Sequence, residues 1–338
     1  RSHGTEFSWG VAGAYRGAVL AGGLYRLCWC PRGYQCSTPD AFGLDIGSLT
    51  VIGPYLPCDV NLNGYSGCAD QNRDVVAGGP YIFDDIKGVG LQDGDRFMVL
   101  DTCGYGDGVQ GFPNSGISDT AISNGTKFYW GSEVVPITTY SGEYRLCWCQ
   151  EGRPCTASKN YILDTGSVVV SGPVGNQVFK CYIYEACSFS HLSGINLRNG
   201  DLVRIMDHCA GSVDFASKCS APSYCELGNS RVSEPAGLSG WLAHRKQHNT
   251  VFLSFGYNEL QTGHGIYRLC WCARGWGHAC ASAADFQMDA GMMIMVGPDL
   301  GQHRTCYRYQ TCTIQNITGT HLEDGDRMIV LESCRTGT

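Results

Sequence analysis

Hydrophobic and polar positions alternate with a period of two in the most informative stretch of the chain, residues 25–30 (Tyr-Arg-Leu-Cys-Trp-Cys). Tyr, Leu and Trp fall on one face, and Arg and both cysteines fall on the other. This alternation of β-forming residues predicts a strand whose aromatic face packs into a core. The hexapeptide recurs at 144–149 and 267–272, so the chain contains three related repeats, each with one such Cys-Trp-Cys strand.

A second apolar segment follows in each repeat, with the pattern aromatic-x-Leu/Met-Asp-x-Gly-x-apolar-x-Val/Met-x-Gly-Pro. It occupies residues 42–54, 161–173 and 286–298. The Asp-x-Gly sequence predicts a hairpin or a bulge between two strand pieces, and Gly-Pro ends the second piece because proline cannot donate to a ladder. We refer to this segment as the Asp-x-Gly strand.

Each repeat ends with a turn signal and a further apolar run. In the first repeat Asp-Gly-Asp at 93–95 leads into Arg96–Leu100 and then to Cys103, and residues 197–209 and 322–334 match this stretch. Asp-Gly or Asn-Gly before an apolar run predicts a tight turn followed by a strand. We refer to this last element of each repeat as the closing strand.

The spacing of turn-forming residues along the whole chain predicts an all-β fold. Turn signals recur about every ten residues, and no segment shows helical periodicity, which is typical of an antiparallel sandwich. We predict three tandem, immunoglobulin-like β-sandwich domains at 1–106, 107–212 and 213–338, the last with an N-terminal linker carrying Cys219 and Cys225. Both ends of the sequence fall near the same phase of the repeat, so we expect a piece of a longer array or a protomer that joins end to end.

The composition argues against several classes of binding partner. The net charge is −7 and no block of like charge occurs, so neither nucleic acid nor an anionic membrane is an expected partner. No apolar run reaches the length of about 18 residues that a membrane span requires. The 46 glycines suit many tight turns between short strands.

The twenty cysteines indicate where the protein is located. Six fall in each repeat at similar spacing and two lie between the second and third repeats, which indicates disulfides and an extracellular or cell-surface location. Repetition and proximity favour one pairing among the many that six cysteines allow. The predicted bonds are Cys28–Cys103, Cys30–Cys36, Cys58–Cys68, Cys147–Cys209, Cys149–Cys155, Cys181–Cys187, Cys219–Cys225, Cys270–Cys334, Cys272–Cys280 and Cys306–Cys312. Sequons at Asn124 and Asn316 predict N-glycans.

Metal sites are the first alternative that we weigh. The spacing Cys-x-Cys-x5-Cys differs from the Cys-x2-Cys spacing of common thiolate sites. Calcium is a better rival, because acidic or amide residues recur in the turns; they are Asp45, Asp164, Asp289, Asp93, Asp95, Asn199, Asp201, Asp324 and Asp326. No loop lines up the six oxygens of an EF-hand-like site, so we favour turn residues whose side chains bond the backbone, and we predict no cofactor.

Catalytic motifs are the second alternative. The nine histidines form no zinc-protease signature, and neither a serine-hydrolase elbow nor a nucleotide-binding loop occurs. His208 lies beside Cys209, but Thr102 and Ser333 occupy its place in the other repeats. We therefore predict that the protein is not an enzyme.

The arginine and tryptophan of the Cys-Trp-Cys strand leave two interpretations open. Arg26, Arg145 and Arg268 could bind a carboxylate ligand, but we favour packing of the arginine stem and pairing with an acid. The tryptophans could stack on sugars, but their place on the face shared with Tyr and Leu predicts that they fill a core.

With both motifs in view, the chain resembles the cysteine-rich tandem repeats of very large secreted or surface proteins of protists and algae. The resemblance covers all three repeats. It implies an extracellular, β-rich, multi-domain protein from a group whose roles include surface coats, adhesion and appendage filaments.

These observations lead to a structural hypothesis. We expect a secreted, disulfide-stapled, glycosylated repeat protein whose partners are copies of itself, joined head to tail in a fibre or surface appendage. Strand exchange between neighbouring protomers is one way to make the joint, because a sheet edge accepts an added strand. The alternative is an adhesin or lectin-like ectodomain that binds its ligand with a variable loop such as Tyr55–Phe83.

Overall fold

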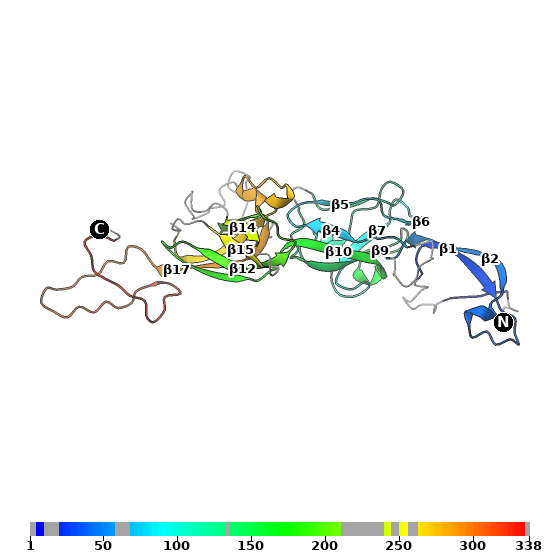
Figure 1. The fold of residues 1–338 in the computed structure, drawn as a ribbon, viewed down its shortest axis with the longest axis horizontal. Coiled ribbons are helices and arrows are strands. Elements are labelled where there is room, and N and C mark those ends of the chain that lie inside the picture. The colour runs from blue at the N-terminus through cyan, green and yellow to red at the C-terminus, as the bar shows by residue number, and fades with distance from the viewer. Residues whose placement is uncertain are drawn as a thin grey trace. The chain divides into compact units, whose positions relative to one another are not determined.

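The computed structural model describes residues 5–9, 20–57, 68–132, 135–210, 240–244, 250–255 and 263–334. Strands form nearly all of its regular structure (Figure 1). The helical elements of these ranges are 3-10 turns of three or four residues, at Pro39–Ala41, Pro113–Gly116, Ser158–Asn160, Arg274–Trp276 and Ala283–Asp285. The predicted all-β, disulfide-rich, sandwich-like fold is confirmed. Over the same ranges, no helix is long and apolar enough to cross a membrane.

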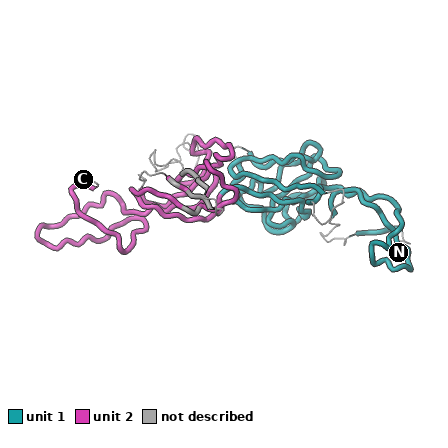
Figure 2. The backbone as a smooth tube through the Cα atoms, viewed as in Figure 1, with its two compact units in different colours: residues 1–172 teal, residues 173–338 magenta. Residues whose placement is uncertain are grey.

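The chain divides into two compact units, residues 1–172 and 173–338 (Figure 2). The boundary at 172 lies within the second repeat, directly before the proline that ends its Asp-x-Gly strand. It coincides with neither of the predicted domain boundaries, which follow residues 106 and 212. The boundary between the compact units therefore falls inside a repeat and not between two repeats.

The main sheet of unit 1 has the strand order β7-β9-β10-β4. These strands are β7 (Arg96–Leu100), β9 (Gly142–Cys149), β10 (Leu163–Pro173) and β4 (Arg73–Val76). The pairs β7/β9 and β9/β10 are antiparallel, and β4 runs parallel to β10. Two short strand pairs also belong to unit 1: β5 (Tyr81–Phe83) with β8 (Phe128–Trp130), and β3 (Gly53–Pro54) with β6 (Gly88–Val89).

The Asp-x-Gly sequence forms a bulge inside one continuous strand. The register of β10 against β9 shifts between Asp164 and Gly166, where one extra residue enters β10. Gly166 has a φ of 154°, a left-handed backbone that favours glycine. Of the two structures that the sequence allowed at this point, the bulge is therefore correct.

Unit 2 repeats the main sheet with the order β11-β17-β16-β13. Its strands are β13 (Leu202–Met206), β16 (Gly265–Cys272), β17 (Met288–Pro298) and β11 (Val178–Tyr182). The directions match those of unit 1, with β11 parallel to β17. From β13 the sheet continues antiparallel through β14 (Gly240–His244), β15 (Thr250–Ser254) and β12 (Ser188–Ile195), and β18 (Gly319–Thr320) pairs with the end of β17.

The core of unit 1 is aromatic on one face of the sheet. The rings of Phe97 and Phe128 meet edge to face with 4.6 Å between centroids, and those of Phe83 and Trp130 are 4.7 Å apart. The indole N–H of Trp130 donates to the carbonyl of Gly116 at 2.8 Å, which satisfies its buried polar group. This core joins β5 and β8 to β7.

A second buried cluster covers the opposite face and contains Met98, Leu100, Cys147, Cys149 and Tyr161. The Cys-Trp-Cys strand of this unit is thus buried on both faces, whereas the sequence predicted burial of the aromatic face alone. The cysteine face is covered because Tyr161 and two disulfides pack against it.

The first repeat also contributes an isolated hairpin, formed by β1 (Gly23–Trp29) and β2 (Leu44–Val51). The two strands pair antiparallel, with the same bulge before Cys28 as in the other repeats. Among the described residues, no third strand pairs with this hairpin.

Candidate functional site

Strands of successive repeats pair with each other across the boundary between the repeats. The closing strand of the first repeat, β7, pairs with the Cys-Trp-Cys strand of the second, β9, so that Met98 lies opposite Cys147. In unit 2, β13 of the second repeat pairs with β16 of the third, and Arg204 lies opposite Cys270. Each folded module therefore combines the second half of one repeat with the first half of the next. The first half contains the Cys-Trp-Cys and Asp-x-Gly strands, and the second half contains the variable loop and the closing strand.

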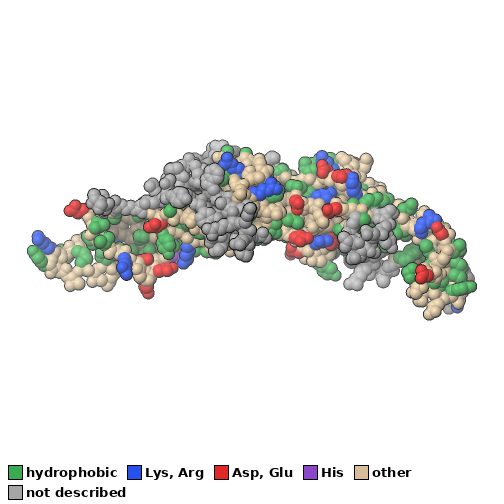
Figure 3. All heavy atoms as spheres, viewed as in Figure 1, with side chains coloured by type: hydrophobic (Ala, Val, Ile, Leu, Met, Phe, Trp, Pro, Cys, Tyr) green, Lys and Arg blue, Asp and Glu red, His purple; other side chains and the backbone are tan. Residues whose placement is uncertain are grey.

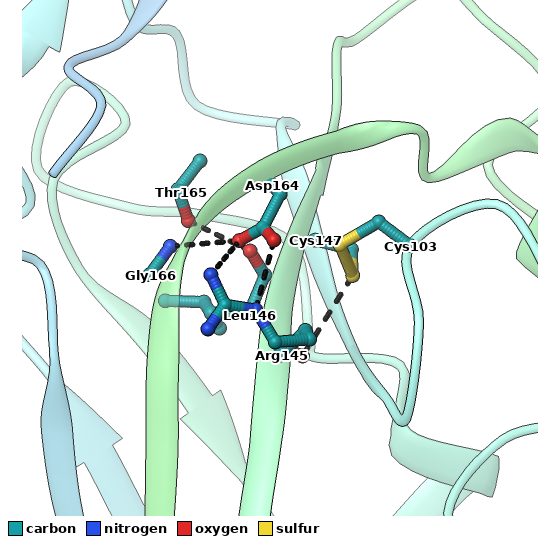
Figure 4. The surroundings of a disulfide bond; sticks show 7 residues. All are labelled: Cys103, Arg145, Leu146, Cys147, Asp164, Thr165 and Gly166. Carbon is teal, nitrogen blue, oxygen red and sulfur yellow. Dashed lines mark hydrogen bonds and ion pairs between the residues drawn. A yellow bond between two sulfur atoms is a disulfide. The ribbon is translucent and has the colours of Figure 1, made fainter.

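Disulfides fix these junctions. Cys103 is bonded to Cys147 and Cys209 to Cys270, with Cα–Cα distances of 5.5 and 5.3 Å (Figure 4). The predicted bonds Cys28–Cys103, Cys147–Cys209 and Cys270–Cys334 are therefore wrong. The reason is geometric, because the closing strand lies against the next repeat's Cys-Trp-Cys strand and brings its terminal cysteine to that strand's first cysteine. Cys28 and Cys334 are free and exposed.

The short-range disulfides lie where the sequence placed them. They are Cys30–Cys36, Cys149–Cys155, Cys181–Cys187, Cys272–Cys280 and Cys306–Cys312. The predicted bonds Cys58–Cys68 and Cys219–Cys225 each include a cysteine outside the described residues. Asn124 and Asn316 are exposed, and their glycosylation stays a prediction.

An arginine–aspartate pair crosses the first half of every repeat. Arg145 donates through Nε and Nη2 to the two carboxylate oxygens of Asp164, each at 2.8 Å (Figure 4). The same pairs are Arg26–Asp45 and Arg268–Asp289. The Arg26 guanidinium, followed by the Gly47 N–H, holds the pKa of Asp45 below its ordinary value. The predicted pairing of these arginines with acids is confirmed.

Two buried turn aspartates link the first and second closing strands to the repeat that follows each. Asp95 is 1% exposed and accepts the N–H of Glu151 at 2.9 Å, while its other oxygen accepts the N–H of Gln92 in its own turn. Asp201 accepts the N–H of Gly275 in the same way at 3.0 Å. Burial raises the pKa of Asp201, although the backbone N–H groups of Arg198 and Gly275, which donate to its carboxylate, lower that pKa. These aspartates serve the turns, as predicted, and also bind the next repeat.

The described residues contain no group of three or more His, Cys, Asp or Glu side chains arranged to hold a metal ion. The cofactor prediction itself stays a prediction.

The Asp95 link gives a first testable prediction. We expect Asp95→Asn to lower the free energy of unfolding of unit 1 by about 1–3 kcal/mol, because the amide nitrogen of the buried side chain would face one of the two N–H donors that the carboxylate now accepts and leave it unpaired. Asp326→Asn is the matched control, since Asp326 is exposed and accepts the N–H of Glu323 in its own turn. Guanidinium denaturation of both variants checks this, and equal losses would contradict it.

A repeated glutamine was missed by the sequence reasoning. The side-chain amide of Gln177 donates to the carbonyl of Ser193 at 3.1 Å and accepts its N–H at 2.8 Å, so it pairs with the backbone as a strand neighbour would. Gln71 pairs with Lys87 in the same way, and Gln302 with Thr318. A signal does exist, because Gln177 and Gln302 each come four residues after a Gly-Pro sequence.

The first half of the first repeat lacks the cover that the other first halves have. Trp29 is 39% exposed, whereas Trp148 and Trp271 are 8% and 1% exposed, as predicted for core residues. Phe42 is also exposed, at a position where the other repeats bury an aromatic ring. Hydrophobic side chains are visible on the surface of this hairpin (Figure 3). In the part of the chain that the structure describes, no closing strand pairs with this half-module.

The second half of the third repeat is exposed in the complementary way: it has a closing segment, but no Cys-Trp-Cys strand pairs with that segment among the described residues. Its closing segment, Arg327–Leu331, matches β7 but pairs with no strand among the described residues. Val330 is 91% exposed, whereas Val99, its equivalent in β7, is completely buried. Met328, Ile329 and Leu331 are exposed too. We refer to the β1–β2 hairpin and residues 299–334 as the two unpaired half-modules, because neither is paired with the half of a neighbouring repeat among the described residues; β18 of the second still pairs with β17 of its own repeat.

The fold and these junctions define a disulfide-rich β-repeat protein whose modules span successive repeats. No family model matches the chain. The chain is 22% identical over 303 residues to the cysteine repeat modular protein B of Toxoplasma gondii, a match that covers 80% of this chain and 3% of that protein. The chain thus spans a small part of that relative's length. The many disulfides and this likeness fit an extracellular or surface protein.

Two solved structures are also similar. One is the SGBP-B protein of the Bacteroides ovatus mixed-linkage glucan utilization locus in complex with a mixed-linkage heptasaccharide, at 12% identity and a TM-score of 0.20, covering 67% of this chain and 44% of that one. The other comprises the fibronectin(III)-like modules of Clostridium thermocellum CbhA, at 10% identity and a TM-score of 0.17, covering 70% and 96%.

Proposed function

We propose that the protein is an extracellular structural protein that assembles head to tail into a fibre or surface appendage. One observation carries the proposal: the chain presents one unpaired first half and one unpaired second half of the same module. The two completed modules show that such halves bind each other. Copies of the chain can therefore bind each other through these two halves.

The type of contact determines the type of assembly. The two half-modules are different surfaces, so the contact between copies is heterologous and leaves one half-module open at each end of any chain of copies. Unless the rotation closes a ring, such a contact propagates as a filament. Disulfides within each module make the subunits suitable for an extracellular fibre.

Negative-stain microscopy tests the proposal. Purified protein, held under oxidising conditions over a range of concentrations, is expected to form linear particles whose length increases with concentration. Size-exclusion chromatography with light scattering measures the same growth. Monomers at every concentration would contradict the proposal, and monomers that bind on a glycan array would favour the adhesin alternative.

A further inference from the structure

We propose that the joint between copies is a completed module, in which residues 299–334 of one copy bind both edges of the β1–β2 hairpin of a second copy and Cys334 forms a disulfide with its Cys28. The inference rests on the proposed head-to-tail assembly and specifies its chemistry. The occupant is a second copy because this chain itself carries the segment that the other two hairpins use.

The completed modules fix the register at the β1 edge. In β7/β9, Phe97 lies opposite Trp148 and Met98 opposite Cys147, and β13/β16 keep the same register. Transferred to the joint, this register places Met328 opposite Trp29 and Ile329 opposite Cys28. Val330 then faces Leu27 across the ladder. The exposed apolar side chains of both partners would become buried, as their equivalents are in units 1 and 2.

The other edge of the hairpin has a predicted occupant as well. In unit 1, β4 runs parallel to β10 with Arg73 opposite Val168. The equivalent positions in the joint are Arg304 and Leu49. The second half thus supplies one strand to each edge of the hairpin, which gives the order of strands seen in both completed modules.

The turn aspartate and the terminal cysteine complete the joint. Asp326 is the equivalent of Asp95, which accepts an N–H two residues beyond the Cys-Trp-Cys strand of the next repeat. In the joint that donor is the N–H of Arg32. Cys334 is the equivalent of Cys103 and Cys209, both of which are bonded to the first cysteine of such a strand, and in the joint it meets Cys28, which is the first cysteine of its strand and is free.

The bond forms by exchange with a disulfide reagent, such as a small-molecule disulfide of the secretory pathway. The thiolate of one cysteine attacks the reagent and forms a mixed disulfide, which releases the first reagent thiol. The thiolate of the other cysteine then attacks the mixed disulfide and releases the second. The two cysteine thiols are oxidised and the reagent is reduced to two thiols, so electrons and protons balance.

Two cysteine variants of the full chain test the joint. Cys28→Ser and Cys334→Ser chains, each alone in oxidised glutathione, should give no Cys28–Cys334 bond, whereas an equimolar mixture should give a covalent dimer and wild type a ladder. If one variant carries ¹⁵N, mass spectrometry should find a peptide pair that joins Cys28 and Cys334 from differently labelled chains. A bond between these cysteines within one wild-type molecule, or dimers through identical cysteines, would overturn the inference.

A strand variant separates a docked joint from two reactive thiols. Val330→Asp, placed in the Cys28→Ser chain, should lower the yield of mixed dimer at least about tenfold, because the carboxylate would be buried against Leu27. Val330 is 91% exposed in the free chain, so circular dichroism and the denaturation midpoint should not change. Unchanged dimer yield would overturn the joint.

Microscopy keeps the two proposals distinct. Linear particles of wild type without the Cys28–Cys334 peptide, and unaffected by Val330→Asp, would retain the proposed function and reject this joint. The absence of linear particles under all conditions would reject the assembly itself.

Discussion

Replacing Cys103 and Cys147 together by alanine is expected to lower the free energy of unfolding of unit 1 by about 4 kcal/mol. The bond closes a loop of 44 residues, so its removal restores much conformational freedom to the unfolded chain. Cys147 is also buried beside Tyr161 and Leu100, Cys103 packs against this cluster, and the smaller alanines leave space there. Guanidinium denaturation checks the loss, with hydrogen exchange of the β7 and β9 amides identifying the transition that belongs to unit 1.

The pair Cys149 and Cys155 provides the matched control. It lies in the same cluster but closes a loop of only six residues, so its double alanine variant should lose about 2 kcal/mol. Equal losses for the two double variants would contradict the assignment of the long loop to Cys103–Cys147. A disulfide map of the wild type that contains Cys28–Cys103 would do so directly.

The elements of this fold could be predicted from local sequence, but their partners could not. Period-two alternation located the Cys-Trp-Cys and closing strands, and Asp-x-Gly located the bulge, because these features depend on neighbouring residues. Whether β7 pairs with the Cys-Trp-Cys strand before it or after it depends on distant contacts. In a tandem repeat both choices present the same residues in the same order, so Cys103 finds an equivalent partner in Cys28 and in Cys147.

The candidate site could not be predicted for the same reason, because the sequence does not say which Cys-Trp-Cys strand each closing strand pairs with. Once the closing strand belongs to the following repeat, neither the first hairpin nor the closing segment Arg327–Leu331 pairs with a strand of another repeat within the described residues, and Cys28 and Cys334 are free. Local sequence at Val330 is nearly identical to that at Val99, and only the pairing makes one exposed and the other buried. The Gln71 amide escaped notice for a related reason, because its hydrogen-bond partner, Lys87, lies 16 residues away.

The second large effect is expected from Phe97→Ala, which should lower the free energy of unfolding of unit 1 by about 3–5 kcal/mol. Phe97 is completely buried, and its ring meets that of Phe128 at 4.6 Å between centroids. Alanine would remove these contacts and leave a cavity between β7 and β8. The denaturation midpoint, measured at an unchanged denaturant slope, reports the loss.

Met328→Ala is the matched control, and it distinguishes a free chain from an assembled one. Met328 is the equivalent of Phe97 but is 69% exposed, so in the monomer its truncation should change the free energy of unfolding by less than about 0.5 kcal/mol. In linear assemblies the same truncation should weaken the contact with Trp29 and raise the concentration needed for growth. A large loss in the monomer would show that the closing segment Arg327–Leu331 is already packed within its own chain, and it would remove the reason for a second copy.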